Sequence, residues 1–207
     1  GAVDIYEENE EEGEIKKPKF MMDAEESSSG AMRGNATHLF MQFFDFDSLE
    51  RLGINGEIDR LCLEKFIFPS DVPLINRKAV LKFFSSPLAE SMKKSRKLYR
   101  EKRFIINYPA ENLTENEKTK KALSGETLLV QGIIDCAFFD ENDELILVDY
   151  KTDRFPPDTD ISVAENTLRT RHTRQMEYYK YACEKMFGKK CSHAYIYSFA
   201  LNKTIEI

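Results

Sequence analysis

Two aspartates and one lysine near the middle of the chain have the types and spacing of a metal-assisted hydrolytic site. Asp135 lies in the segment QGIIDCAFF, and Asp149 lies in LILVDYKTD with Lys151 two positions later. Residues two apart in a strand share a face, so Lys151 falls beside Asp149. Carboxylates bind divalent cations that activate water, and an ammonium group orients that water or neutralises developing negative charge. The alternative for such a trio is a partly exposed strand end with a local ion pair.

The flanking residues predict that the two aspartates face each other across a hairpin. Residues 128–139 and 144–150 are apolar runs typical of strands, and they surround the polar segment 140–143. A register centred on Asn142 places Asp135 opposite Asp149, with Cβ atoms about 5 Å apart. Opposed like charges destabilise a sheet unless something cationic lies between them, and a divalent metal or an ammonium group would serve.

The hairpin is apolar on both of its faces. The residues expected on the carboxylate face are Ile133, Ala137, Phe139, Leu145 and Leu147, and those expected on the other are Ile134, Phe138, Ile146 and Val148. Such strands lie inside a sheet that helices cover on both sides. Charges there are costly unless they are paired or coordinated, which favours the metal hypothesis over the exposed ion pair.

Five segments in this order resemble the RecB-type branch of the PD-(D/E)xK nucleases. They are Gly34-Asn-Ala-Thr-His38, Tyr99-Arg-Glu101, G-I-I-D ending at Asp135, D-Y-K-T-D from Asp149 to Asp153, and Gln175-Met-Glu-Tyr-Tyr179. The combination of D-Y-K-T-D with Q-x-x-x-Y is specific, whereas G-x-x-x-H alone would be weak. The resemblance extends from about Met32 to the end of the chain. Within the branch it is similar to the C-terminal nuclease domains of AddAB-type helicase–nucleases.

The resemblance implies a restriction-endonuclease-like α/β fold, with a central mixed β-sheet flanked by helices and a helical N-terminal part before it. It also implies a Mg²⁺ or Mn²⁺ site whose ligands are His38, Asp135, Asp149 and the backbone carbonyl of Tyr150. A lone histidine on an apolar helix face is more often a hydrogen-bonded core residue, and the resemblance is what favours a ligand role for His38. No iron–sulfur cluster is expected, because Cys62, Cys136, Cys183 and Cys191 lack the close grouping that such clusters require.

The remaining catalytic residues follow from the same resemblance. Lys151 would act on the water or the transition state, with Thr152, Asp153 and Arg154 as supports. Gln175 and Tyr179 lie one helical turn apart and would contact the DNA backbone or orient Lys151, although they could instead be a polar pair at the edge of an amphipathic helix. Glu101 is a possible additional acid, or else a surface glutamate among basic neighbours.

Basic residues gather in two segments that could neutralise DNA phosphates. The candidates are Lys93, Lys94, Arg96, Lys97, Arg169, Arg171 and Arg174, and the first run continues through Arg100, Lys102 and Arg103. His172 lies within the second segment. A solvated helix face is the usual alternative for such runs.

Charge divides the chain into two parts. The first thirty residues hold ten acids and three lysines, a formal charge of −7, whereas the whole chain carries −6. Residues 1–30 are therefore expected to be an acidic disordered linker, and residues 31–207 a nuclease domain of about +1 that tolerates a polyanionic partner. No apolar run approaches the roughly 18 residues that a membrane span needs. The scattered cysteines suggest reduced thiols and a cytoplasmic location.

The pattern of apolar residues predicts alternating helices and strands. Helices are expected at residues 32–52, 57–66, 76–84, 88–97 and 166–187, and strands at 98–108, 128–139, 144–150, 192–199 and 204–207. A polar connection is expected at residues 109–125.

Three functions fit these features. The first is a metal-dependent exodeoxyribonuclease domain of an ATP-dependent helicase–nuclease subunit, with a role in double-strand break repair by homologous recombination. It would hydrolyse single-stranded DNA unwound by helicase domains of the same full-length chain, together with an AddB-like partner subunit. The second is a stand-alone exonuclease of the same fold. The third is a catalytically silent DNA-binding or assembly module.

Overall fold

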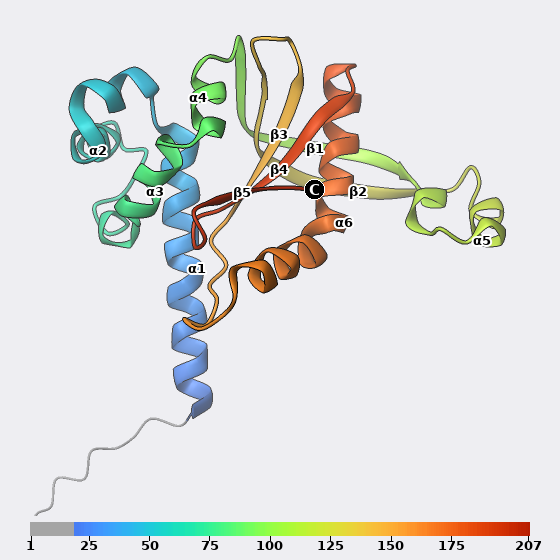
Figure 1. Ribbon diagram of the computed structural model, residues 1–207, viewed down its shortest axis with the longest axis horizontal. Helices are drawn as coiled ribbons and strands as arrows, with labels where there is room; N and C mark the ends of the chain where they lie inside the picture. The colour runs from blue at the N-terminus through green and yellow to red at the C-terminus, as the bar shows by residue number, and fades with distance from the viewer. Residues whose placement is uncertain (1–18) are drawn as a thin grey trace, which may run out of the picture.

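The computed structural model describes the backbone of residues 19–207 and the side chains from residue 30 onward (Figure 1). The first part of the expected linker, residues 1–18, lies outside the described residues. Residues 19–30 are helical, which differs from the expected linker. The acidic and serine-rich composition of this segment concealed the continuation of the first helix toward the N-terminus.

One five-stranded mixed sheet forms the centre of the fold. Its strands are β1 (Lys97–Pro109), β2 (Thr127–Phe139), β3 (Leu145–Lys151), β4 (Cys191–Ser198) and β5 (Lys203–Glu206). They lie in the order β1-β2-β3-β4-β5, and every neighbouring pair is antiparallel except β3 and β4, which are parallel. A parallel pair needs a long crossover, and a helix makes this one. The expected α/β fold with a mixed sheet is confirmed.

Helices cover both faces of the sheet (Figure 1). They are α1 (Lys19–Phe43), α2 (Phe46–Leu63), α3 (Arg77–Phe84), α4 (Pro87–Lys93), α5 (Glu117–Ala122) and the crossover α6 (Ile161–Phe187), with 3₁₀ turns η1 (Val72–Leu74) and η2 (Ala110–Leu113). One hydrophobic core lies between the sheet and α1–α4, and a second lies between the sheet and α6. Within the described residues, no helix is long and apolar enough to cross a membrane.

Two helix boundaries differ from those expected near the N-terminus. Helix α1 ends at Phe43, and α2 begins at Phe46 after the cap Asp45, whose side chain accepts a hydrogen bond of 2.8 Å from Ser48 N. A single helix over residues 32–52 was therefore wrong, because an N-cap inside the apolar run begins a new helix. Helix α2 continues to Leu63 across a kink at Gly53, where φ is 68°.

The later elements are close to those expected. Every boundary of β2, β3, β4 and β5 lies within one residue of the expected position. Helix α6 ends before Gly188, whose φ of 64° is typical of a glycine cap. Helix α6 begins earlier than expected, at Ile161 after its cap Asp160. Helix α4 ends at Lys93, so residues 94–96 connect it to β1 rather than extending the helix.

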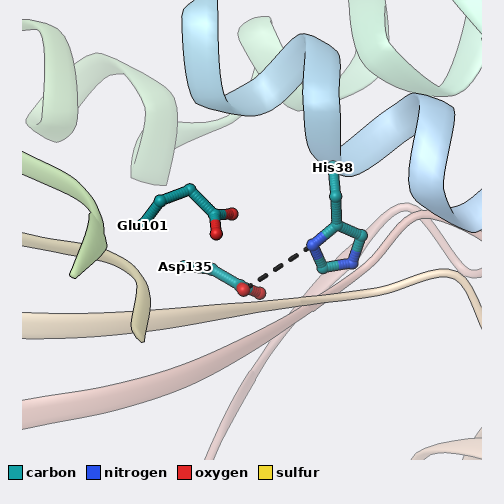
Figure 2. Close-up of side chains that lie close together, drawn as sticks. All are labelled: His38, Glu101 and Asp135. Carbon is teal, nitrogen blue, oxygen red and sulfur yellow. Dashed lines mark ion pairs between the residues drawn. The ribbon is translucent and has the colours of Figure 1, made fainter. Parts of the chain in front are cut away.

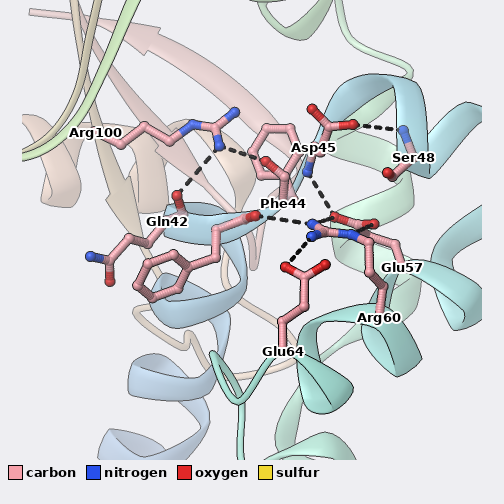
Figure 3. Close-up of polar contacts among 9 residues, drawn as sticks. Gln42, Phe44, Asp45, Ser48, Glu57, Arg60, Glu64 and Arg100 are labelled. Carbon is pink, nitrogen blue, oxygen red and sulfur yellow. Dashed lines mark hydrogen bonds and ion pairs between the residues drawn. The ribbon is translucent and has the colours of Figure 1, made fainter.

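Two arginines hold the C-terminal end of α1 (Figure 3). Arg60 of α2 donates to Phe43 O at 3.3 Å, and Arg100 of β1 donates to Phe44 O at 2.6 Å. The Arg100 guanidinium also lies 3.9 Å from the centre of the Phe44 ring. Cations are favourable at helix C-termini, where carbonyl groups lack helical partners. Arg100 therefore fixes α1 against the sheet and is not part of a solvated basic face.

Glu57 anchors Arg60 from inside the protein. Its carboxylate accepts bonds of 2.8 Å and 2.6 Å from Arg60, and a further bond of 2.7 Å from Asp45 N. Glu57 is fully buried, and its charge raises the pKa of Arg60 through this hydrogen-bonded pair. The pair thus connects the cap of α2 with the carbonyl end of α1.

Replacing Glu57 should destabilise the fold far more than replacing its exposed counterpart. Glu57→Ala removes the fully buried carboxylate that accepts hydrogen bonds from both Arg60 and Asp45 N, and it is expected to lower the free energy of unfolding by about 3 kcal/mol. Glu64 pairs with the same Arg60 at 2.7 Å but is 46% exposed, so Glu64→Ala should cost less than about 1 kcal/mol. Urea denaturation of the two variants measures the difference, and equal losses would contradict this account of the junction.

Candidate active site

The hairpin brings Asp135 and Asp149 to adjacent strands in the register that the sequence predicts. The ladder between β2 and β3 pairs Cys136 with Val148 and Phe139 with Leu145. Asp135 and Asp149 occupy the next positions on this register. Asp135 Oδ2 accepts a hydrogen bond of 2.7 Å from Tyr150 N, which holds its carboxylate against β3. The predicted hairpin register is confirmed.

The ladder between β1 and β2 is interrupted at the same level. It pairs Arg100 with Cys136 and Lys102 with Ile134, but it omits the Glu101–Asp135 pair between them. Glu101 has φ 49°, a left-handed conformation that is uncommon for residues other than glycine. The backbone distortion turns the Glu101 and Asp135 carboxylates out of the regular ladder.

This interruption also corrects the expected faces of β2. Cys136 packs in the core under α1–α4, whereas Ile134 packs in the core under α6, although the two residues are two positions apart. Ile133, which was expected on the buried carboxylate face, is 38% exposed. Counting back from Phe139, the strict alternation of side chains between the two faces of β2 holds only as far as Asp135. The left-handed residue Glu101 on the neighbouring strand changes the local twist there.

Helix α1 places His38 above the hairpin. Gly34 lies one turn before His38, and a Cβ atom at Gly34 would lie 2.8 Å from Thr152 Oγ1. A side chain there would push α1 away from the residues that follow β3. The absence of a side chain at Gly34 thus permits a close approach between α1 and Thr152.

Three potential metal ligands converge between α1 and the sheet. His38, Glu101 and Asp135 each offer a ligand atom, and these atoms lie within 4.8 Å of one another. Figure 2 shows the three side chains pointing toward a common space, with His38 Nδ1 3.6 Å from Asp135 Oδ1. Glu101, expected only as a possible acid, lies within this group. One imidazole and two carboxylates suit Mn²⁺ well and are compatible with Mg²⁺.

Asp149 lies beside this group and is paired with Lys151. The Lys151 Nζ atom is 2.7 Å from Asp149 Oδ2 and donates a bond of 3.0 Å to Gln175 Oε1. Asp149 is only 2% exposed. The expectation that Gln175 orients the Lys151 ammonium agrees with this geometry. Lys151 and Gln175 come from β3 and α6, which meet at the end of the parallel pair of strands.

Tyr179 lies one turn beyond Gln175 on α6. Its ring packs edge-on against Phe104, with centroids 5.4 Å apart, and contacts the position of Gly132. Burial raises the pKa of the Tyr179 hydroxyl, and the Gln175 side chain hydrogen-bonds to it. Tyr179 therefore supports Gln175 from the second core.

The crowding of acids is visible in their proton affinities. Burial, opposed by Lys151 and reinforced by Asp135, raises the pKa of Asp149 to about 6. Burial and the Asp135 charge also raise the pKa of Glu101. Burial lowers the pKa of His38, but the hydrogen bond and charge of Asp135 outweigh it, and the net change is upward. A bound dication would reverse these preferences, because it favours ionised carboxylates and a neutral imidazole.

Most of the DNA-binding candidates have protein partners. Lys93 pairs with Glu50, Lys94 with Glu90, and Arg171 with Asp153. Arg169 donates to the carbonyl of Glu206, and Arg174 pairs with Glu177 at 2.9 Å. Arg96 and Lys97 lie at the start of β1, close to the acidic turn after β2. These ion pairs favour a role in surface packing over phosphate binding for the paired residues.

His172 is closer to the site than its sequence context suggested. Its Nε2 atom is 3.6 Å from Asp153 Oδ2. Burial, with added repulsion from Lys151, lowers the pKa of the imidazole. The signal in the sequence was its position three residues before Gln175, which places both on one helix face.

The fold and the site together define a restriction-endonuclease-like α/β core with an acidic cluster beside a lysine. No family model matches the chain. Among curated proteins, the AddA component of the ATP-dependent helicase/nuclease of Clostridium kluyveri is 34% identical over 194 residues, covering 93% of this chain and 15% of the relative. That of Clostridium perfringens is 33% identical over 206 residues, covering 97% and 16%. That of Acetivibrio thermocellus is 34% identical over 185 residues, covering 89% and 14%.

Over nearly its whole length, the chain therefore belongs to the AddA family of ATP-dependent helicase/nuclease subunits, and it corresponds to one segment of those longer proteins. It spans about 15% of the relatives' length. Among solved structures, the crystal structure of SSO0001 aligns over 91% of this chain and 78% of that chain, with a TM-score of 0.32 and 12% identity, a similarity too weak to support any conclusion.

The buried Asp149 charge should make the metal-free protein less stable as pH rises. Its pKa is about 6 in the folded state and near 4 when unfolded, so the folded state binds the extra proton between these values. Stability contributed by that proton is present below pH 4 and lost above pH 6. Asp149→Asn removes the titrating group, so the variant should not lose this stability. The free energy of unfolding of the variant minus that of the wild type should therefore increase by about 2 kcal/mol between pH 4.5 and 7.5.

Thermal or urea unfolding in chelator at the two pH values measures this change. Asp158→Asn, an exposed substitution of the same type, serves as the control and should show no such dependence. If the Asp149→Asn and wild-type curves run parallel with pH, the raised pKa is refuted.

Proposed function

We propose that this chain is a divalent-metal-dependent deoxyribonuclease domain that hydrolyses phosphodiester bonds of single-stranded DNA. One observation carries the proposal: His38, Glu101 and Asp135 converge within 4.8 Å on a site flanked by the Asp149–Lys151 pair. Carboxylates crowded in this way are unfavourable without a cation, and a phosphodiesterase needs such a cation. The relatives' description as helicase/nuclease subunits supports the same reaction class.

The donor set fits Mg²⁺ or Mn²⁺. His38, Glu101 and Asp135 would hold the ion, with Asp149 and the backbone carbonyl of Tyr150 as further oxygen donors. When bound, the ion would lower the pKa of a water molecule and stabilise negative charge on the phosphoryl oxygens.

The chain's own residues position the charges around that water. Lys151 stands between Asp149 and Gln175, so its ammonium has a fixed direction even before substrate binds. It orients the attacking water and neutralises charge that develops on the phosphoryl oxygens in the transition state. Gln175 uses its side-chain carbonyl oxygen to hold Lys151, and Tyr179 lies one helical turn further along α6.

The wider context of the family suggests the substrate and the partners. The relatives are described as helicase/nuclease subunits, so their names include a helicase as well as a nuclease activity. We propose that helicase domains of a full-length chain, with an AddB-like partner subunit, deliver unwound single strands to this domain. The enzyme would act as an exonuclease in double-strand break repair by homologous recombination.

A cleavage assay tests the proposal directly. The purified protein is incubated with single- and double-stranded DNA in Mg²⁺, Mn²⁺ or chelator, and products are resolved by length. Cleavage of the single strand with either metal and none in chelator is expected. DNA binding without cleavage under every condition would favour the silent binding module.

Removing the lysine should abolish cutting while leaving the fold intact. Lys151→Met removes the ammonium at the reacting phosphate, and single-turnover cleavage should fall by about a thousandfold. Lys118→Met, on the distant helix α5, provides a charge-matched control that should cut at the wild-type rate. Circular dichroism and the melting temperature check that both variants are folded. A Lys151→Met variant with full activity would refute the assigned role.

Gln175→Ala should separate positioning of Lys151 from metal binding. The substitution frees the Lys151 ammonium, so the cleavage rate should fall by about ten- to a hundredfold, while Mn²⁺ affinity measured by calorimetry stays unchanged. Gln42→Ala is a suitable control, because only the backbone carbonyl of Gln42 has a described role. Loss of Mn²⁺ affinity in Gln175→Ala would instead make Gln175 part of the metal site.

A further inference from the structure

A small cavity lies behind the acidic cluster, between α1 and the chain segments that follow β3 and β4. Its volume is about 80 Å³, well above the roughly 10–15 Å³ that one water molecule requires. The lining includes Arg33, Gly34, Leu74, Thr152, Arg154 and Phe199. These residues come from α1, from η1, and from the loops after β3 and β4.

The polar part of the lining suits an oxyanion. Arg33 from α1 and Arg154 from the loop after β3 both line the cavity, so two arginines from different elements border one space. Arginine matches the geometry of phosphate oxygens through its planar fork of donors. None of the lining residues is acidic. Thr152 adds a hydroxyl donor, and Leu74 and Phe199 provide apolar parts of the wall.

The cavity and the acidic cluster share two chain segments. Gly34 lines the cavity, and His38 lies one helical turn further along α1, about 5.4 Å away along the axis. Thr152 lines the cavity, and Lys151 immediately precedes it. The missing side chain at Gly34 also keeps the cavity open, because a Cβ there would lie 2.8 Å from Thr152 Oγ1. A DNA strand seated at the cluster would cover this separation within one or two nucleotides.

We propose that Arg33 and Arg154 form a subsite for a backbone phosphate of the DNA strand, one or two nucleotides from the bond that is cut. The proposal rests on the nuclease function proposed above and adds residues to it. Both arginines grip the same phosphate, which fixes the register of the strand before Lys151 acts. The subsite binds ground state and transition state alike, so it governs affinity and KM rather than kcat.

The first test measures binding of a fluorescent single-stranded oligonucleotide by anisotropy over a range of KCl concentrations. Ca²⁺ replaces Mg²⁺, and a gel confirms that the strand remains intact. Arg33→Gln/Arg154→Gln should bind about tenfold more weakly than wild type. The slope of log affinity against log salt should fall by about 0.7, the value for one phosphate on a single strand. Each single substitution should cause nearly the whole effect, because both arginines hold one group.

Two further variants control for charge and folding. Arg51→Gln/Lys118→Gln removes the same charge from exposed positions on α2 and α5, away from the cavity, and should leave affinity and slope close to wild type. Arg33→Lys/Arg154→Lys keeps the charge but removes the planar forks, and it should recover only part of the affinity. Melting temperatures of all variants confirm that they are folded.

A second test locates the phosphate on the strand. Oligonucleotides carrying a single uncharged methylphosphonate are compared at successive positions. Wild type should lose about tenfold in affinity at one position near the cleavage point, and Arg33→Gln/Arg154→Gln should be insensitive at that position. Equal sensitivity of the two proteins at every position overturns the subsite.

The outcomes separate this proposal from the nuclease function. A wild-type protein that cuts DNA, with affinity and salt slope unaffected by the double substitution, overturns the subsite and leaves the nuclease standing. A protein that shows the position-specific phosphate effect but never cleaves DNA supports the subsite and overturns the nuclease. Weakening equal to that of the Arg51→Gln/Lys118→Gln control also overturns the subsite, since it reflects net charge alone.

Discussion

The repulsion among carboxylates at the interruption of the β1–β2 ladder is the constraint on which the site depends. Glu101 adopts a left-handed backbone conformation that costs roughly 1 kcal/mol or more. It then adds a carboxylate beside Asp135, whose charge already acts on Asp149. Neither the backbone strain nor the crowded charge stabilises the fold, since an apolar residue at position 101 in a regular ladder would pack better. Strain and crowded charge at one point are typical of a functional site.

The same stretch of β1 also determines where α1 lies. Arg100 binds the carbonyl end of α1 and stacks on Phe44, and the next residue, Glu101, faces His38 of that helix. One dipeptide therefore attaches the helix to the sheet and supplies an acid to the cluster. A shift of β1 would move both contacts together. This coupling explains how a histidine on a helix is held at ligand distance from carboxylates on strands.

The sequence was sufficient to predict the centre of this arrangement. The hairpin register follows from apolar runs placed evenly around Asn142, and the pairing of Cys136 with Val148 has that centre. Periodicity could not predict the change of face beyond Asp135, because it originates from a single φ angle at Glu101. The role of Arg100 was also hidden, since a run of basic residues resembles a solvated face until a helix terminus is placed against it. Composition likewise concealed the helical start of α1.

Helix α1 connects the acidic cluster with the cavity behind it, and this arrangement limits what the helix can contain. His38 needs the helix close to the hairpin, while Gly34 permits that approach only because Thr152 meets no Cβ there. Arg33 precedes Gly34 on the same helix, and it lines the cavity together with Arg154. Substitution at Gly34 would thus withdraw an imidazole from one site and close the other. Gly34 one turn before His38 thus has a physical reason: the glycine lets α1 approach Thr152, and that approach holds the histidine near the hairpin.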